Sequence, residues 1–290
     1  MKLFFLLNPS RVKNRWDWRE VAARHAKKNG WTASFGEVDR SLPNSINRQL
    51  EQALEQGCSR IVVIGGDGSL HRIINILGQR KKLTSIELAI VPGGTCNDFA
   101  RFIGLRRQRI ENAFHLACSG KAHSTDLGLL NSELFLNNAG LGRRPVTLVK
   151  RWKSIQALRT FRPTQLRLRW DKGSIEGSFY MALVCNAPYF SGGLHFSKTV
   201  SIHDGLLDVY LMPAISKWRI LPLIALGRLG RPARMKRLVT LRVSQLEMEA
   251  DADFWPQADG EPPLPATRSV SFAVSSEKAM IVAPPTARLA

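Results

Sequence analysis

The chain contains the segment Arg60-Ile61-Val62-Val63-Ile64-Gly65-Gly66-Asp67-Gly68-Ser69, in which an apolar run leads directly into a glycine-rich turn. The four consecutive β-branched residues indicate a buried parallel strand, because such a strand is covered on both faces and need not alternate. The glycines allow a sharp turn and close approach to a ligand. Apolar residues at helical spacing follow as far as Leu77, so a helix is predicted where the glycines end.

A strand, a glycine turn and a helix N-terminus together favour an anion. Exposed backbone N–H groups and the helix dipole both attract phosphate at such a place. Asp67 would repel a phosphate unless a cation lay between them, so its position points to Mg²⁺ as well as to a nucleotide. The alternative is a tight turn with no ligand.

The charge of the chain is strongly positive, with a formal net charge of +19 over 290 residues. The stretch from Arg143 to Lys172 holds ten Lys and Arg residues against one acid, and no acid lies between Asp208 and Glu247. Clustered positive charge predicts a polyanionic partner, either nucleic acid or an anionic membrane surface. Trp152 and Trp218 lie beside basic residues, a pattern typical of helices on anionic lipid, although a solvated basic face has the same composition.

The cysteines and the first residues bear on the compartment. Four widely spaced cysteines without a C-x-x-C pair indicate reduced thiols in a reducing compartment. The apolar run that begins at Leu3 stops at Asn8, which is too short for a signal peptide. No window approaches the roughly 18 apolar residues of a membrane span. We therefore expect a cytoplasmic protein that is peripheral on the inner face of the membrane, with no transmembrane segment.

The first part of the chain alternates strands and helices, which predicts a doubly wound parallel sheet. Such sheets bind ligands at the carboxyl ends of their strands. The expected α/β domain covers residues 1–125. Its predicted strands are Lys2–Leu7, Thr32–Val38, Arg60–Ile64 and Glu87–Val91, and its predicted helices are Asp17–Asn29, Pro43–Gln56, Leu70–Leu77 and Arg109–Cys118.

The second part, residues 126–275, has short strand-like segments separated by turns and predicts a β-rich, sandwich-like domain. The segment 276–290 is expected to return to the first domain with a strand over Lys278–Val282. The other predicted strands are Asp126–Leu130, Leu134–Asn138, Gln165–Trp170, Phe179–Cys185, Leu206–Met212, Lys236–Glu249 and Arg268–Val274.

A second glycine turn follows the next buried strand and reads Val91-Pro92-Gly93-Gly94-Thr95-Cys96-Asn97-Asp98-Phe99-Ala100-Arg101. It repeats the first turn, with glycines, a hydroxyl, an aspartate and an apolar helix start. One such turn is a weak signal. Two on neighbouring parallel strands would line one crevice from two sides.

The two turns together resemble the diacylglycerol kinase catalytic domain of bacterial lipid kinases, which are related to sphingosine and ceramide kinases. The resemblance implies an N-terminal sheet of the NAD kinase and phosphofructokinase type. Matches continue in the family's order through Asn8-Pro9-Ser10, Ser124–Gly128, Asn137–Gly142, Asn186 with Gly192-Gly193, Asp204–Val209 and Asp259-Gly260-Glu261. Departures are Ser69 in place of a threonine, Arg72 in place of an acid and Arg11 in place of a glycine.

The resemblance also implies roles for individual residues. The chain would bind ATP and Mg²⁺, with Asp259 as the general base. The nucleotide would be surrounded by Asn8, Ser10, Gly65, Gly66, Asp67, Gly68, Ser69, Leu70, His71, Arg72, Gly94, Thr95 and Asp98. The catalytic Mg²⁺ would be held by the network of Asp67, Asp98 and Asp126, and a second, structural Mg²⁺ by Asp204 and Asp208. The same two-turn motif suits phosphoryl transfer on physical grounds, because that reaction needs mainly positioning and charge neutralisation.

The predicted function is an ATP-dependent lipid kinase that phosphorylates a hydroxyl of a membrane lipid such as diacylglycerol. An NAD kinase shares the Gly-Gly-Asp-Gly motif but differs at the second turn. A catalytically silent regulator that binds membrane or nucleic acid would also explain the basic surface, but no nucleic-acid motif is present, so we expect no nucleic-acid partner. A homodimer is a further alternative.

Overall fold

The computed structural model describes residues 1–9, 17–39, 41–42, 44–105, 109–142, 162–197, 200–214 and 238–284. The chain divides into two structural units. One comprises Met1–Leu127 with the segment that begins at Ser276, and the other comprises Gly128–Ser275. This division gives the α/β and β-rich parts that the sequence predicts, and the fold class is confirmed.

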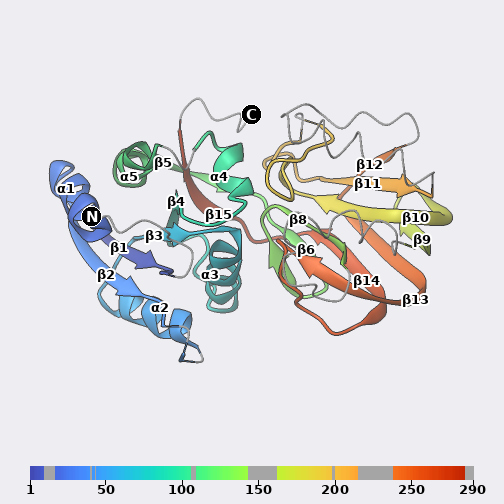
Figure 1. Ribbon diagram of the computed structural model, residues 1–290, viewed down its shortest axis with the longest axis horizontal. Coiled ribbons are helices and arrows are strands. Elements are labelled where there is room, and N and C mark those ends of the chain that lie inside the picture. The colour runs from blue at the N-terminus through green and yellow to red at the C-terminus, as the bar shows by residue number, and fades with distance from the viewer. Residues whose placement is uncertain are drawn as a thin grey trace. The chain divides into compact units, whose positions relative to one another are not determined.

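The first unit is built on one six-stranded sheet (Figure 1). The four strands β1 to β4 run parallel, and the last strand pairs antiparallel with β5. In spatial order the strands are β2 (Thr32–Glu37), β1 (Lys2–Leu7), β3 (Arg60–Gly65), β4 (Glu87–Pro92), β15 (Ala279–Ala283) and β5 (Lys121–Thr125).

Helices cover both faces of this sheet (Figure 1). Two helices, α1 and α5, contact each other on one face, and α2 contacts α3 on the other. Asp17 begins the first helix by accepting hydrogen bonds from the N–H groups of Arg19 and Glu20. The helices are α1 (Trp18–Lys28), α2 (Ser45–Glu55), α3 (Asp67–Gln79), the short α4 (Asp98–Phe102) and α5 (Ile110–Ser119).

The core of the first unit explains its apolar strands. Every residue of β3 is buried, including the β-branched run Ile61–Ile64. A buried arginine, Arg60, begins this strand. It forms an ion pair with Glu87 and donates hydrogen bonds to the carbonyls of Ala117 and Gly120 at the end of α5. These bonds satisfy carbonyls that a helix end leaves without intrahelical donors.

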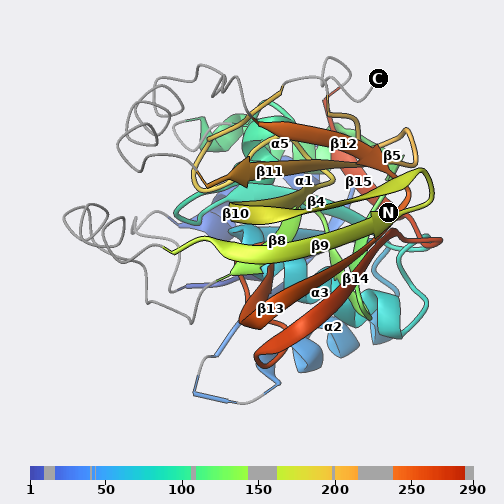
Figure 2. The same cartoon turned by 90° about the vertical axis from the view of Figure 1, so that its right-hand side faces the viewer.

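The second unit is one strongly curved antiparallel sheet (Figure 2). Its path runs β12-β11-β10-β8-β13-β14-β6-β7, and β9 bridges β10 and β13 beside β8. Alternating side chains such as Leu166 and Leu168 of β9 point into its core. The strands are β6 (Gly128–Leu130), β7 (Glu133–Phe135), β8 (Asn138–Gly142), β9 (Thr164–Trp170), β10 (Gly173–Cys185), β11 (Leu207–Pro213), β12 (Val239–Val243), β13 (Gln245–Ala258) and β14 (Thr267–Val274).

The predicted limits of three strands were wrong. The strand expected over Asp126–Leu130 starts only at Gly128, as β6, and Asp126 lies in the connection from β5, a strand that was not predicted. The one expected over Leu134–Asn138 is divided by a turn into β7 and β8. The one expected over Lys236–Glu249 breaks at Ser244 into β12 and β13. In the second case the apolar residues continue as far as Leu136, into the turn, so the pattern alone does not show where that strand ends.

Two further expectations concern thiols and membrane spans. None of the four cysteines forms a disulfide, as predicted. No helix in the described residues is long and apolar enough to cross a membrane. Trp152 and Trp218, and most of the basic residues around them, lie outside the described residues.

Candidate phosphate and base sites

The first glycine turn forms the N-terminus of a long helix. Strand β3 ends at Gly65, Gly66 is the N-cap residue, and α3 begins at Asp67. The N-cap residue has no side chain that could cap the helix. The N-terminus of α3 therefore has the geometry that binds an anion in other proteins, with N–H groups and the helix dipole pointing the same way.

The two glycine turns are in direct backbone contact. The carbonyl of Gly65 accepts hydrogen bonds from the N–H groups of Gly93 and Gly94, at 2.7 and 3.1 Å. A Cβ atom added to Gly94 would lie 2.5 Å from the Cα of Gly66, and one added to Gly66 would lie 2.9 Å from the Cα of Gly94. Neither position has room for a side chain, which explains why both are glycine. The predicted proximity of the two turns is confirmed.

Asp67 joins the first turn to the helix that follows the second. Its Oδ2 accepts a hydrogen bond from the N–H of Asp98 at 3.0 Å, and its Oδ1 accepts one from the N–H of Phe99 at 3.1 Å. The carboxylate therefore caps α4 from a distant part of the chain. Asn97, in the left-handed region with φ of 51°, closes the second turn by hydrogen bonds in both directions with Gly94.

Asn8 connects the end of β1 to the same turn. Its N–H donates to the carbonyl of Ile64, and its Nδ2 donates to the Oγ of Ser69 at 2.9 Å. A Cβ on Gly65 would lie 2.9 Å from that Oγ, so a side chain at this position would displace Ser69. Ser10, predicted beside Asn8, lies outside the described residues.

The remaining predicted nucleotide residues differ in exposure. Leu70 and His71 are buried, at 2% and 4% exposure, and Leu70 belongs to the core-facing side of α3. Arg72 and Thr95 are exposed, and Gly68 is half-buried. Of the predicted nucleotide residues, Arg72 and Thr95 are therefore open to solvent, whereas the side chains of Leu70 and His71 are not.

Asp126 is almost fully buried, at 1% exposure, and forms an ion pair with Lys278. The ammonium Nζ lies 2.7 Å from the carboxylate Oδ1. The pairing follows from sheet register, since Ala279 lies opposite Thr125 and the two residues are next along each chain. The sequence did not indicate Lys278, because its partner depends on the return of the last strand to the first sheet.

The carboxylates of Asp67 and Asp98 supply the hard oxygen donors that Mg²⁺ prefers. Among the residues that the structure describes, no three His, Cys, Asp or Glu side chains form a group that could hold a metal. Mg²⁺ usually keeps several waters and takes one or two carboxylates together with substrate phosphates. The donors at the two turns therefore fit an ion that binds with a nucleotide, and they do not form a preformed cage.

The second predicted metal position does not fit a cation in the same way. The guanidinium of Arg242 pairs with Asp204 and lies 3.7 Å, from Nε to Oδ1, from Asp208. Burial raises the pKa of the Asp208 carboxyl, Arg242 lowers it, and the neighbouring Asp204 raises it. A positive side chain thus already lies between the two carboxylates, and they do not fit a second Mg²⁺.

Asp259 lies in the second unit, at the turn after β13. Its backbone is in the left-handed region, with φ of 51°. Its carboxylate accepts three backbone hydrogen bonds, from the N–H of Leu136 at 2.9 Å to Oδ2 and from those of Asn137 and Asn138 at 2.7 and 3.1 Å to Oδ1. Its own N–H donates to the carbonyl of Asn138 at 2.8 Å. The side chain is therefore held in one orientation.

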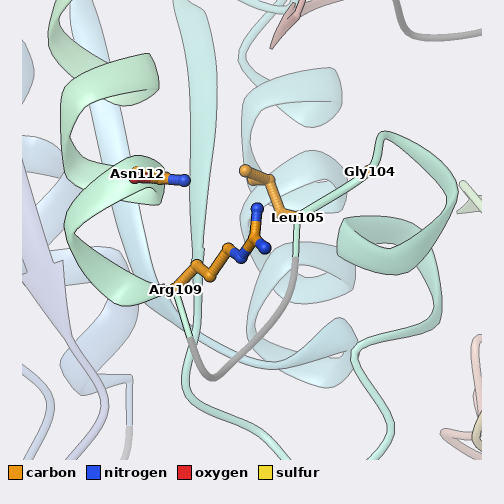
Figure 3. A pocket seen from close by; sticks show the side chains of 4 residues that line it. All are labelled: Gly104, Leu105, Arg109 and Asn112. Atoms are coloured by element: carbon orange, nitrogen blue, oxygen red, sulfur yellow. The ribbon is translucent and has the colours of Figure 1, made fainter.

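A cavity of about 300 Å³ lies at the start of α5 (Figure 3). Residues that line it include Gly104, Leu105, Arg109 and Asn112, and Figure 3 shows the Arg109 guanidinium directed toward Leu105. None of these four belongs to the predicted nucleotide, metal or base residues.

Two family models match this chain and together cover most of its length. Residues 2–130 match the diacylglycerol kinase catalytic domain, and residues 139–275 match the YegS C-terminal NAD kinase beta sandwich-like domain. A probable YegS-like lipid kinase of Pseudomonas aeruginosa (strain UCBPP-PA14) is 31% identical over 74% of each chain. A diacylglycerol kinase of Bacillus subtilis (strain 168) is 23% identical over 69% of this chain and 70% of its own.

A solved structure extends the likeness to the fold. A diacylglycerol kinase from Bacillus anthracis str. Sterne superposes with a TM-score of 0.76, covering 99% of this chain and 98% of its own, at 19% identity. The chain therefore belongs to the family of lipid kinases that combine a diacylglycerol kinase catalytic domain with a YegS-type C-terminal domain. It is a lipid kinase.

Proposed function

We propose that this lipid kinase transfers the γ-phosphate of ATP to a hydroxyl of a membrane lipid such as diacylglycerol, with Mg²⁺. The observation that supports this most is the backbone contact between Gly66 and Gly94, which joins two glycine turns beside Asp67. Two adjacent turns of this kind suit a polyphosphate better than a single anion. In the proposed complex the backbone N–H groups of these turns bind the phosphates, as no P-loop lysine motif is present.

The other residues take roles that follow from their chemistry. Asn8, Ser69 and Thr95 are the polar side chains proposed beside the nucleotide, and Asp67 and Asp98 would hold Mg²⁺ with help from Asp126. When bound, the ion supplies positive charge for the phosphate oxygens. Because the Lys278 ammonium already pairs with Asp126, that aspartate has a cation partner before any ligand binds.

Asp259 is proposed as the general base. Its carboxylate takes the proton of the lipid hydroxyl while the hydroxyl oxygen forms a bond to the γ-phosphorus and the bond from that phosphorus to ADP breaks. The three N–H groups that hold the carboxylate fix its direction without adding a competing base. All residues proposed at the nucleotide lie in the first unit, and this base lies in the second.

A labelled-ATP assay tests the proposal. The protein is incubated with Mg²⁺ and vesicles that contain diacylglycerol, ceramide or sphingosine, or with NAD, and the products are identified by mass. We expect a phosphorylated lipid as the product when vesicles are present, and no product with NAD. Phosphorylation of NAD would replace the proposal by the NAD kinase function, and no product with any acceptor would favour a silent regulator.

The membrane association is a separate part of the proposal. The formal charge of +19 predicts that the protein floats with vesicles rich in phosphatidylserine and not with pure phosphatidylcholine vesicles. Flotation should weaken as salt increases, because surface electrostatic attraction is screened. If the protein floated equally well with both kinds of vesicle, electrostatic binding to the membrane would be contradicted.

A further inference from the structure

The turn that holds Asp259 is itself held from its other side. The turn Leu136–Asn138 connects β7 to β8, and its N–H groups point to the Asp259 carboxylate. The carbonyls of Leu136 and Asn137 accept hydrogen bonds from Asn186, which follows β10 directly. All of these residues belong to the second unit.

Asn186 is fully buried, with 0% exposure. Its Nδ2 donates a hydrogen bond to the carbonyl of Leu136 at 2.8 Å, and its backbone N–H donates one to the carbonyl of Asn137 at 2.9 Å. Sheet register sets this position, since Cys185 lies opposite Asn138 in the antiparallel pair β10 and β8. The next residue along β10 therefore faces the turn.

One peptide group connects the two side chains. The carbonyl of Leu136 and the N–H of Asn137 belong to one planar peptide group, with Asn186 bound to one end and Asp259 bound to the other. The next peptide group, with the carbonyl of Asn137 and the N–H of Asn138, is bound to the backbone N–H groups of Asn186 and Ala187 at one end and to Asp259 at the other. A rotation of the first peptide plane would break its hydrogen bonds to both side chains, so the Asn186 amide fixes the orientation of one of the donors that orient Asp259. Hydrogen bonds in such chains also polarise one another.

We propose that the side chain of Asn186 positions Asp259, acting through the peptide group between Leu136 and Asn137. This proposal rests on the proposed role of Asp259 as the base. The amide does not touch substrate in this scheme. It sets the direction in which the carboxylate meets the acceptor hydroxyl.

A double-mutant cycle tests this proposal with the full chain. Asn186→Ala, Asp259→Asn and the double variant are compared in the labelled-ATP assay with diacylglycerol vesicles. We expect Asn186→Ala to lower kcat about 10- to 100-fold, the range expected for small misplacements of a catalytic group, with the KM for ATP unchanged. In the Asp259→Asn background the same change should have no further effect, because residues that act as one unit are not additive.

A matched control separates positioning from loss of stability. Val184, also on β10 and fully buried, belongs to the main core, so Val184→Ala destabilises the same strand without touching the turn. It should keep the kcat of the folded protein. Hydrogen exchange measured by mass spectrometry should show faster exchange of the amides at 136–138 in Asn186→Ala than in Val184→Ala. If Asn186→Ala yields no soluble protein, Asn186→Ser gives the same comparison.

The outcomes distinguish this proposal from the function itself. An active wild type in which the two substitutions have additive effects overturns the role of Asn186 and leaves the lipid kinase proposal standing. The same holds if Asn186→Ala keeps its kcat, or if the amides at 136–138 exchange no faster. A wild type that phosphorylates no lipid overturns the proposed function, and the positioning role with it.

Discussion

The substitution Asp259→Asn separates the structural and chemical roles of this carboxylate. Asparagine keeps the shape of the side chain but replaces one oxygen by an NH₂ group. If the remaining oxygen faces Asn137 and Asn138, the NH₂ group faces the N–H of Leu136, which then loses its acceptor. In the opposite orientation two donors lose their acceptor. The first orientation is therefore expected.

The magnitude follows from these contacts. A half-buried donor that loses its partner costs about 1–3 kcal/mol, and the two retained bonds weaken because the acceptor is no longer charged. We expect Asp259→Asn to lower the free energy of unfolding by about 2–3 kcal/mol. That leaves most molecules folded if the protein has the usual stability of about 5–15 kcal/mol. Loss of a general base should reduce turnover about 10²- to 10⁴-fold.

The measurement combines urea unfolding with the labelled-ATP assay on diacylglycerol vesicles, corrected for the folded fraction, and with a binding assay for ATP. Nucleotide binding should survive, because the residues proposed for it lie in the other unit. Asp171→Asn is the matched control, since Asp171 is exposed on the turn between β9 and β10. Turnover by Asp259→Asn within about threefold of the control would refute the base assignment. An unchanged free energy of unfolding would refute the account of the hydrogen bonds.

Three other changes test separate parts of the structure. Gly94→Ala forces a Cβ to 2.5 Å from a backbone atom, so ATP binding should be lost and the free energy of unfolding lowered by about 1–3 kcal/mol. Gly173→Ala is the control and should change neither property, because nothing lies nearer than 3.4 Å to its added Cβ. Normal ATP binding by Gly94→Ala would contradict the contact between the turns. Arg242→Gln should lower the free energy of unfolding by about 1 kcal/mol at pH 7, as measured by urea unfolding, and should raise the pKa of Asp208 further. This loss of stability should become smaller as the pH falls and the Asp208 carboxyl is protonated. A lowered pKa of Asp208 in an NMR titration of the variant would contradict the role of Arg242. Burial raises the pKa of the Cys118 thiol to about 11, so its contribution to stability is fully present below pH 9.0 and is lost as the pH rises through 11. At pH 8 it should react with iodoacetamide about 100-fold more slowly in the folded than in the urea-unfolded protein, as peptide mapping can show, and equal rates would contradict burial.

The sheet and its glycine turns could be predicted because their signals are local. The run Ile61–Ile64 is apolar at every position, and a strand with that pattern must be covered on both faces. Gly66 and Gly94 follow such strands directly, so parallel alignment brings their turns to one edge. Strand boundaries in the second unit were harder to predict. There, the pattern over Leu134–Asn138 continues through a reversal that only hydrogen bonding defines.

The partners of the predicted aspartates could not be predicted from their motifs. The family resemblance implied a cation near Asp126 and near Asp208, and the structure places the cationic side chains of Lys278 and Arg242 there. Each of these pairs depends on which strands lie side by side. A motif specifies a carboxylate and its turn, but not the side chain that another strand brings to it.

The amino-acid sequence alone was enough to predict the local features of this lipid kinase: two glycine turns, their aspartates and an Asp-Gly turn near the end of the second unit. Local pattern is sufficient for these features, because backbone conformation and residue type within a few positions decide them. What each carboxylate contacts depends instead on which strands the fold brings together. Asp259 and the N–H of Leu136 are 123 positions apart in the chain, and the antiparallel pairing of β8 with β13 brings them within 2.9 Å.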